Sequence, residues 1–185
     1  MTAIVASDIV FLLSAPGAST GYTSTGTAGN SRGKYASTTV LSGTPLDNLF
    51  TDITGAENAA SQVDYACLFV LNNTASGNSM INTIAWLPTS LDVSGGATIQ
   101  LANDNIGITT KGASAVQAAT IASTTTAPTG VSAYVGTSAT NAGGINVGTV
   151  APGSVFAVWF KRTAHNTAPV NNDGFSLQID FDTQG

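Results

Sequence analysis

Hydrophobic and polar residues alternate most regularly close to the C-terminal end of this chain. The apolar positions are Phe175, Leu177, Ile179 and Phe181, and a polar residue stands between each of them and the next. A period of two is what a strand produces when one face is buried and the other contacts water. The pattern therefore predicts a half-buried strand over residues 175–182.

Two other segments are apolar at both phases of the alternation. Residues 64–71 place Tyr65, Cys67, Phe69 and Leu71 on one face and Ala66, Leu68 and Val70 on the other. Residues 155–162 likewise place Val155, Ala157 and Trp159 opposite Phe156, Val158 and Phe160. A strand that is apolar on both faces is covered on both. We expect the core of the chain to cover one face of each strand and another subunit to cover the second.

Further short strands are predicted between turn-forming residues, at 9–13, 79–87, 97–102, 131–135 and 144–150. Roughly seven or eight such strands are typical of a sandwich or jelly roll. Helix is scarce: residues 45–52 begin with Pro and have helical spacing, and residues 115–122 are a weaker candidate. A chain of 185 residues is most naturally one domain. The sequence thus predicts an all-β, single-domain antiparallel β-sandwich or jelly-roll-like fold over residues 1–185, with one or two short helical segments.

Residues 16–34 form a long stretch of Gly, Ser, Thr and Ala in which Tyr22 is the only aromatic side chain. Loops of this length are usually functional or disordered. Because the segment has little with which to order itself, we expect it to lie against the body of the protein or, preferentially, against a neighbouring molecule. The candidate assembly interface combines residues at this loop with residues of the two apolar strands: Tyr22, Arg32, Lys34, Tyr35, Leu68, Val70, Phe156 and Phe160.

Charge is sparse in this chain: 8% of its residues are charged, against about a quarter in an average soluble domain. The formal net charge is −5, and the cations come near one another only as the pairs Arg32/Lys34 and Lys161/Arg162. Nucleic-acid binding needs clustered cations, so we expect no nucleic-acid partner. No apolar run reaches about 18 residues, so we expect no membrane-spanning segment.

The single cysteine, Cys67, excludes an internal disulfide and is typical of a protein made in a reducing compartment. It stands in an apolar run, where a buried thiol is expected. The first residues lack a basic start and place Asp8 just before the short apolar run at 9–13. We therefore expect no signal peptide.

The chain contains few residues of the kinds that catalyse reactions or bind metals. Residues 17–21 match the G-x-S-x-G spelling of a hydrolase nucleophile, but that motif requires a downstream acid and histidine, and His165 is the only histidine. Asp180 and Asp182 share one face of the last predicted strand, where alternation favours a solvated face over a cation or glycosidase site. We expect no catalytic residue, metal, cofactor or small-molecule substrate.

Two longer segments carry further motifs. Residues 45–73 read PLDNLFTDITGAENAASQVDYACLFVLNN, a short amphipathic segment and an acidic turn before a strand. Residues 148–183 read GTVAPGSVFAVWFKRTAHNTAPVNNDGFSLQIDFDT, a Pro-Gly turn into a strand, then a loop into an Asp-Gly-Phe strand. Both segments resemble a group of small structural proteins of tailed bacteriophages, which are capsid-decorating or tail-associated. The resemblance implies no catalytic residue.

The resemblance implies a non-enzymatic virion protein, a capsid decoration or cement protein that binds between major capsid protein subunits on the outer surface of the head. It would be made in the host bacterial cytoplasm, and decoration sites commonly lie on local three-fold axes, so a homotrimer is expected. Its contacts are expected to be mostly neutral. One alternative is a tail or baseplate component. The other is a carbohydrate-binding host-attachment module, whose signature would be exposure of aromatic residues such as Trp86 and Trp159.

Overall fold

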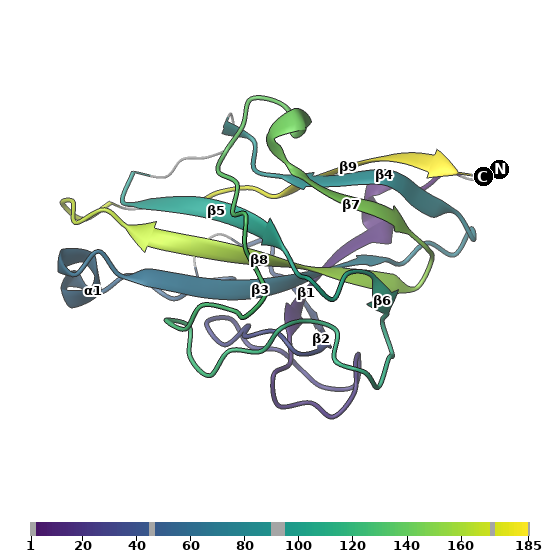
Figure 1. Cartoon of the computed structure of the whole chain (residues 1–185), viewed down its shortest axis with the longest axis horizontal. Helices are drawn as coiled ribbons and strands as arrows, with labels where there is room; N and C mark the ends of the chain where they lie inside the picture. Colours follow the sequence, from purple (N-terminus) through teal and green to yellow (C-terminus); the bar gives the residue numbers. More distant parts are fainter. Residues whose placement is uncertain (1–2, 45–46, 90–94, 171–172, 185) are drawn as a thin grey trace.

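Two antiparallel sheets stack face to face in the computed structural model, which describes residues 3–44, 47–89, 95–170 and 173–184 (Figure 1). Strands make up 38% of the structure and helix 7%, so the expected all-β sandwich is confirmed. The elements are η1 (Ala6–Asp8), β1 (Ile9–Ser14), β2 (Ala36–Val40), α1 (Gly55–Ala59), β3 (Val63–Asn72), β4 (Ser79–Trp86), β5 (Ala97–Asn103), β6 (Thr109–Thr110), η3 (Asn141–Gly143), β7 (Ile145–Val150), β8 (Ser154–Ala164) and β9 (Gln178–Gln184).

The larger sheet has the strand order β2-β1-β3-β8-β5, with the short β6 paired to β8, and the smaller sheet has the order β7-β4-β9. The two strands predicted to be apolar on both faces, β3 and β8, pair along their length at the centre of the larger sheet, with Cys67 opposite Trp159. In Figure 1 the smaller sheet lies above the larger sheet, and the long loops lie below it. The molecule therefore has three layers, of which the lowest is built from loops.

The first core lies between the two sheets. It is built from one face of β3 and β8, from Met80 and Ala85 of β4, and from Ile99 and Leu101 of β5. Phe175, Leu177, Ile179 and Phe181 are partly buried and pack against this core, as the alternation predicted. Regular strand pairing in this segment begins only at Gln178, so the strand is shorter than expected at its start.

The second core lies on the opposite face of β3 and β8, beneath the loops. Phe69, Trp159 and Cys67 are fully buried there against Ala118 and Ile121, which belong to a long loop after β6. The expectation that another subunit covers this face is therefore wrong, because loops of the same chain cover it. Segments 16–34 and 111–136 together form this cover, which we call the loop layer.

Buried polar groups fasten the loop layer to the sheet. The Ser31 hydroxyl donates to the carbonyl of Cys67 at 2.5 Å and accepts the Ser14 N–H at 2.8 Å. The fully buried Gln117 accepts the Ala36 N–H at 2.9 Å through its side-chain oxygen. Each bond satisfies a group that would otherwise be buried without a partner, a loss that costs about 1–3 kcal/mol.

Asp104 makes the most extensive of these attachments. Its carboxylate, 2% exposed, accepts the indole N–H of Trp159 at 2.8 Å, the Ala119 N–H at 2.8 Å and the Ile106 N–H at 2.9 Å. Gly33 approaches the same indole so closely that an added Cβ would lie 2.8 Å from the Trp159 ring. It has a φ of +80°, which only glycine adopts readily, so the loop can reach the sheet at this point.

Loops of the chain also occupy both edges of the larger sheet. At β2 the Thr38 N–H donates to the Ser24 carbonyl at 2.9 Å, and the Ala36 carbonyl accepts the Tyr22 N–H at 2.7 Å. At β5 the backbones of Leu101 and Val135 exchange two hydrogen bonds, of 2.7 and 2.8 Å. The strand predicted at 131–135 is wrong, because this isolated bridge is its only pairing.

Neither predicted helix forms within the described residues. Residues 47–52 are bends and coil, residues 45–46 lie outside the described part of the chain, and residues 115–122 are irregular because Gln117 and Ala118 bond to Lys34 of the other loop. The short helix α1 begins instead at Gly55. Thr54 and Glu57 cap it reciprocally, since each side chain accepts the backbone N–H of the other.

Candidate functional site

The loop layer brings together two cations that are distant in sequence. The Lys34 ammonium donates to the Ala18 carbonyl at 2.8 Å, and the Lys111 ammonium lies 4.8 Å from the centre of the Tyr22 ring. Thr20 fixes this arrangement, because its hydroxyl donates to the Ala113 carbonyl at 3.0 Å. Both ammonium groups therefore lie against the same short stretch of loop, residues 18–22.

Two further cations belong to the same side of the larger sheet. Lys161 alternates with Trp159 along β8, so its side chain points toward the loop layer, where its ammonium lies 5.9 Å from the Tyr134 ring. Arg32 donates from Nη1 to the Ala122 carbonyl. We call Tyr22, Arg32, Lys34, Lys111, Tyr134 and Lys161 the cationic face.

Tyr134 is the tyrosine of the cationic face whose pKa is shifted. Its ring packs against Tyr65 with the ring centres 6.1 Å apart, and its hydroxyl is buried with no hydrogen-bond partner in the described structure. Burial raises the pKa of Tyr134 above the usual value, and the nearby Tyr65 adds to the shift. The phenol therefore stays neutral and contributes an apolar ring with one unused polar atom.

The eight residues of the expected interface divide into three sets. Tyr22, Arg32 and Lys34 are partly exposed and meet on the cationic face, whereas Tyr35 is 4% exposed and donates its hydroxyl to the Ser114 carbonyl at 2.9 Å. The other four point into the core between the sheets and are at most 1% exposed: Leu68, Val70, Phe156 and Phe160. Val70 and Phe156 therefore offer no surface to another molecule, which corrects that part of the expected interface, whereas Leu68 and Phe160 lie at the floor of a groove between the sheets.

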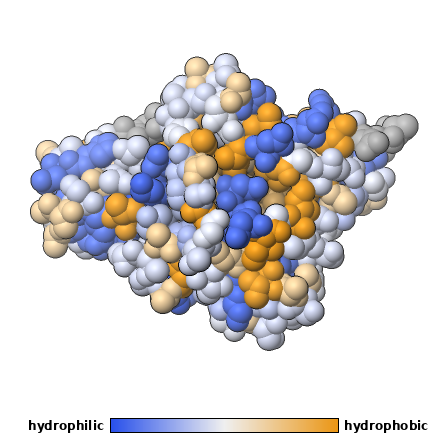
Figure 2. All heavy atoms as spheres, in the orientation of Figure 1, coloured by the Kyte–Doolittle hydropathy of each residue, from blue (hydrophilic) through white to orange (hydrophobic). Residues whose placement is uncertain are grey.

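Sequence reasoning did not include Lys111, Tyr134 and Lys161 in the candidate interface. The position of Lys161 was readable, because strand alternation places it on the same face as Trp159. Nothing around Lys111 or Tyr134 in the sequence shows which side of the sheet the long loop will cover. In Figure 2 pale colours of intermediate hydropathy cover much of the visible face, and orange and blue residues gather near its middle.

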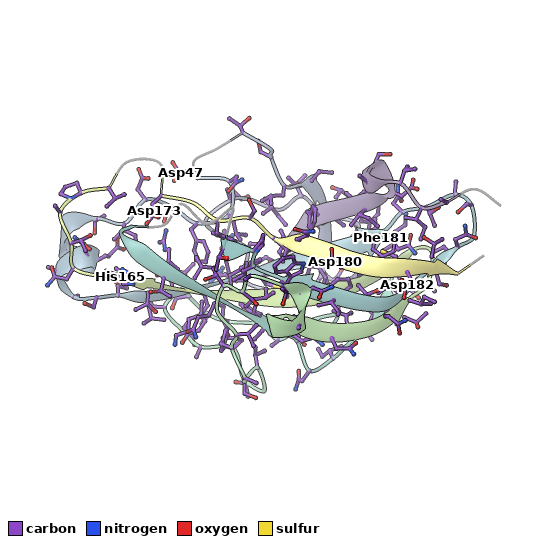
Figure 3. The ribbon with its side chains drawn as sticks, turned by 90° about the horizontal axis from the view of Figure 1, so that it is seen from above. Asp47, His165, Asp173, Asp180, Phe181 and Asp182 are labelled. Atoms are coloured by element: carbon purple, nitrogen blue, oxygen red, sulfur yellow. The ribbon has the colours of Figure 1, made fainter. Side chains whose placement is uncertain are left out.

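Several of the carboxylates lie on the other side of the molecule. Figure 3, seen from the side of the smaller sheet, shows Asp47, Asp173, Asp180 and Asp182 there. Asp180 accepts the indole N–H of Trp86 at 3.1 Å, and Asp182 accepts an amide N–H of Asn82 at 2.9 Å. Asp180 and Asp182 of β9 each accept a hydrogen bond from a side chain of β4, so they do not converge on one ligand.

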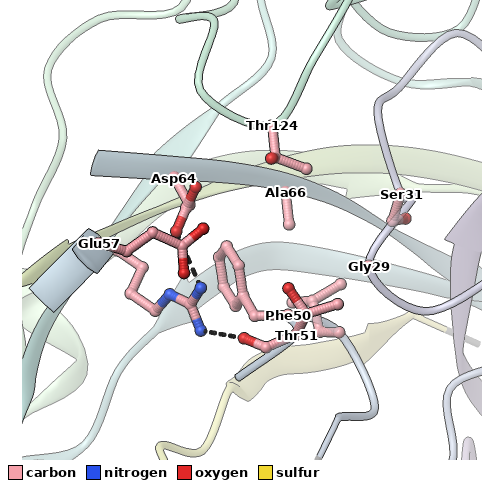
Figure 4. A pocket seen from close by; sticks show the side chains of 10 residues that line it. Gly29, Ser31, Phe50, Thr51, Glu57, Asp64, Ala66 and Thr124 are labelled. Atoms are coloured by element: carbon pink, nitrogen blue, oxygen red, sulfur yellow. Dashed lines mark hydrogen bonds and ion pairs between the residues drawn. The ribbon is translucent and has the colours of Figure 1, made fainter. Parts of the chain in front are cut away.

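One small pocket surrounds an ion pair between the β3 and β8 strands (Figure 4). Arg162 binds Asp64 at 2.8 Å, donates to the Thr51 carbonyl at 2.7 Å, and lies 4.6 Å from the centre of the Phe50 ring. The free volume is about 40 Å³, which is room for about one water molecule. Within the described residues this is the only ion pair, and its contacts fasten the segment before α1 to the sheet.

A larger groove opens where the smaller sheet leaves the larger one uncovered. Its volume is about 780 Å³, its floor includes Leu68, Ile99 and Phe160, and its sides are formed by residues from the ranges 41–43, 47–55, 167–170 and 173–177. Asn58 joins the two sides by donating to the Thr167 carbonyl at 2.6 Å. Asp173 is already occupied by the backbone N–H groups of Gly95 and Gly96, at 3.0 and 3.1 Å. The groove is lined by apolar residues and by polar ones that include the charged side chains Asp47, Asp52, Asp173 and Arg162.

No constellation for covalent or metal chemistry is found in the described part of the chain. No three His, Cys, Asp or Glu side chains there gather closely enough to hold a metal ion. Ser19 lies exposed in the loop layer, and His165 bonds to Thr98 on β5 through Nε2. Cys67 is fully buried, which raises the pKa of its thiol well above the usual value.

The two tryptophans are core residues. Trp159 is fully buried and Trp86 is 8% exposed, so neither offers an open platform for a sugar.

No helix in the described residues is long and apolar enough to cross a membrane. No protein-family model, no curated protein and no solved structure matches this chain. The fold and the arrangement of its side chains are therefore the basis for inferring its function.

Proposed function

We propose that this protein is a non-enzymatic structural protein of a tailed-bacteriophage virion, a decoration or cement protein that stabilises the head by binding between major capsid protein subunits. The observation that carries the proposal is the use of buried polar groups. Ser31, Gln117 and Asp104 all fasten loops onto the larger sheet. Because these hydrogen bonds hold the long loops in one arrangement, the loops form a contact surface that needs little further ordering when a partner binds.

The composition supports the same role. Only 8% of residues are charged, so an extensive contact made by this chain is mainly neutral. A stable interface buries about 800 Å² on each partner. That is roughly a tenth of the 8445 Å² of surface that the described structure exposes. The loop layer comprises segments 16–34 and 111–136, and hydrogen bonds hold both in place. We propose that it supplies this area without the ordering of new segments.

The proposed setting accounts for the single cysteine and for assembly. A protein made in the host bacterial cytoplasm folds without disulfides, and Cys67 is buried and free. Decoration of an icosahedral head favours attachment at local three-fold axes, so the proposed assembly is a homotrimer on the outer capsid surface. The sparse Lys and Arg residues favour a protein partner over nucleic acid.

The test is to mix the purified protein with heads that lack it, with isolated tails, and with host cell-surface glycans. We expect co-sedimentation with heads at a saturating ratio that matches sites on the capsid lattice, and heads that resist heating better when the protein is bound. Binding to tails alone would make the protein a tail or baseplate component. Binding to glycans alone would make it a host-attachment module, and either result would overturn the proposal.

A further inference from the structure

Charge is segregated between the two sides of this molecule. Of the five cations, Arg32, Lys34, Lys111 and Lys161 lie on the cationic face, and only Arg162 lies on the other side. Asp104 also contacts the loop layer, but its carboxylate is buried and bonded to three donors, and Glu57 and Asp64 lie at the edge of this layer in the pocket that contains the Arg162 ion pair. An overall acidic chain thus has one side on which positive charge prevails.

The positive charge of this face is not cancelled within the chain. Arg162 is paired with Asp64, whereas Lys111 and Lys161 have tyrosine rings as their partners, at 4.8 and 5.9 Å. A ring positions an ammonium group through its quadrupole but leaves the full charge in place. The two lysines therefore remain available for a carboxylate of another molecule, with tyrosine beside each of them.

The surroundings of these lysines have the composition of a protein-binding surface. Tyrosine is enriched at the centres of protein interfaces, where it contributes a rigid ring and one hydroxyl. Tyr22 and Tyr134 supply such rings beside Lys111 and Lys161, and the Tyr134 hydroxyl itself is buried. The loop backbone is already fixed by Ser31 and Gln117, so binding here would require little new ordering.

We propose that the cationic face is the docking side of the protein, and that its partner is an acidic protein surface. This rests on the proposed function, in which that surface belongs to the capsid and the acidic side of the molecule faces away from the head. The neutral loops supply most of the contact area. Lys111 and Lys161 select the orientation, since complementary charge steers encounter and excludes the reversed arrangement.

Nucleic acid and a second copy are the other acidic partners to be tested. Four cations spread over loops and a strand do not form the continuous basic stripe that tracks a phosphate backbone, and the net charge of −5 opposes the approach of a polyanion. Stacking of copies would place the cationic face of one against the opposite, acidic side of the next, and a contact between opposite sides extends into an open filament rather than a closed trimer.

The test compares two double variants of equal net charge. Lys111→Gln with Lys161→Gln removes two charges from the cationic face, and Asn141→Asp with Asn146→Asp adds two negative charges to exposed positions near the smaller sheet. Each takes the formal net charge from −5 to −7. A third variant, Lys111→Arg with Lys161→Arg, keeps both charges. Thermal melting of each variant checks that the fold is intact.

Affinity for heads lacking the protein is measured at about 0.05 M and about 0.5 M salt, where screening differs strongly. We expect the glutamine variant to bind roughly three- to tenfold more weakly at low salt, as for two exposed charge pairs, with a smaller difference at high salt. The asparagine-to-aspartate and arginine variants should bind as the wild type does.

The outcomes separate the two proposals. If the wild type binds no heads, the proposed function fails. If the wild type binds heads and the glutamine variant binds equally well, or the aspartate variant is the weaker one, the docking side is wrong while the function stands. Lysine-dependent binding to duplex DNA measured by fluorescence anisotropy, or lysine-dependent self-association measured by sedimentation, would replace the acidic protein surface as the partner.

Discussion

Asp104 and Asp180 offer a matched pair of substitutions, because each carboxylate accepts the indole N–H of one of the two tryptophans. The Asp104–Trp159 bond is 2.8 Å long and buried, whereas the Asp180–Trp86 bond is 3.1 Å long and partly buried. Replacing each aspartate by alanine removes the same acceptor from two different environments. The comparison therefore contrasts a buried carboxylate that accepts from Trp159 and two backbone N–H groups with a partly buried one that accepts from two side chains.

The expected loss of stability differs several-fold between the two sites. Asp104→Ala leaves the indole N–H of Trp159 and the Ala119 N–H without their acceptor, and each unsatisfied buried donor costs about 1–3 kcal/mol. Removing the carboxylate also ends the cost of burying its charge, so we expect a net loss of about 3 kcal/mol. At Asp180→Ala water can replace the lost acceptor, and the expected loss is below about 1 kcal/mol.

Urea unfolding followed by far-ultraviolet circular dichroism measures both losses without relying on tryptophan fluorescence. A double-mutant cycle between Asp104→Ala and Trp159→Phe should give a coupling free energy of about 1 kcal/mol or more, because each change removes the same hydrogen bond. If Asp104→Ala costs no more than Asp180→Ala, or the cycle is additive within about 0.5 kcal/mol, the view that this bond fastens the loop layer is refuted.

Three further predictions concern single groups. Ser31→Ala should lower the free energy of unfolding by about 1–3 kcal/mol in the same urea assay, because the Ser14 N–H loses its acceptor; an unchanged midpoint would contradict this. Burial raises the pKa of the Cys67 thiol, so a thiol-reactive dye should label it only as urea unfolds the protein, and labelling of the folded protein would refute its burial. The pKa of Tyr134 is raised above its usual 10.0, so its contribution to stability is complete below that pH and is lost as the pH rises further. Alkaline titration should accordingly destabilise the wild type more than Tyr134→Phe, and equal losses would contradict the raised pKa.

The strands that the sequence predicted correctly are those whose own residues alternate or are wholly apolar, such as β3, β8 and β5. The strand β2 reads Ala-Ser-Thr-Thr-Val and has no such pattern, so its pairing with β1 depends on a neighbour rather than on its own side chains. The helix α1 did have a local signal that the prediction missed. Its Thr54 and Glu57 have the spacing of a capping box, which outweighed the helical spacing of residues 45–52.

The candidate site was predicted less completely, for a related reason. The sequence showed that β3 and β8 need cover on both faces but not what provides it, because the covering loops are held by scattered polar bonds rather than by a hydrophobic stripe. Tyr22 and Arg32, which precede β2, lie partly exposed in the loop layer, and their part in an assembly interface stays a prediction. Lys111 joins them only because Thr20 and Gln117 hold its loop against residues 18–22 and β2.

The occupied edges of the larger sheet bear on how this protein behaves at high concentration. Exposed strand edges are templates on which other chains add strands, which leads to aggregation. At β2 the loop residues Tyr22 and Ser24 already use the outward-facing backbone groups, and at β5 Val135 does the same for Leu101. At high concentration these loops hinder copies of the chain from joining edge to edge through β2 and through Leu101 of β5, so contacts between copies would have to use side-chain surfaces instead.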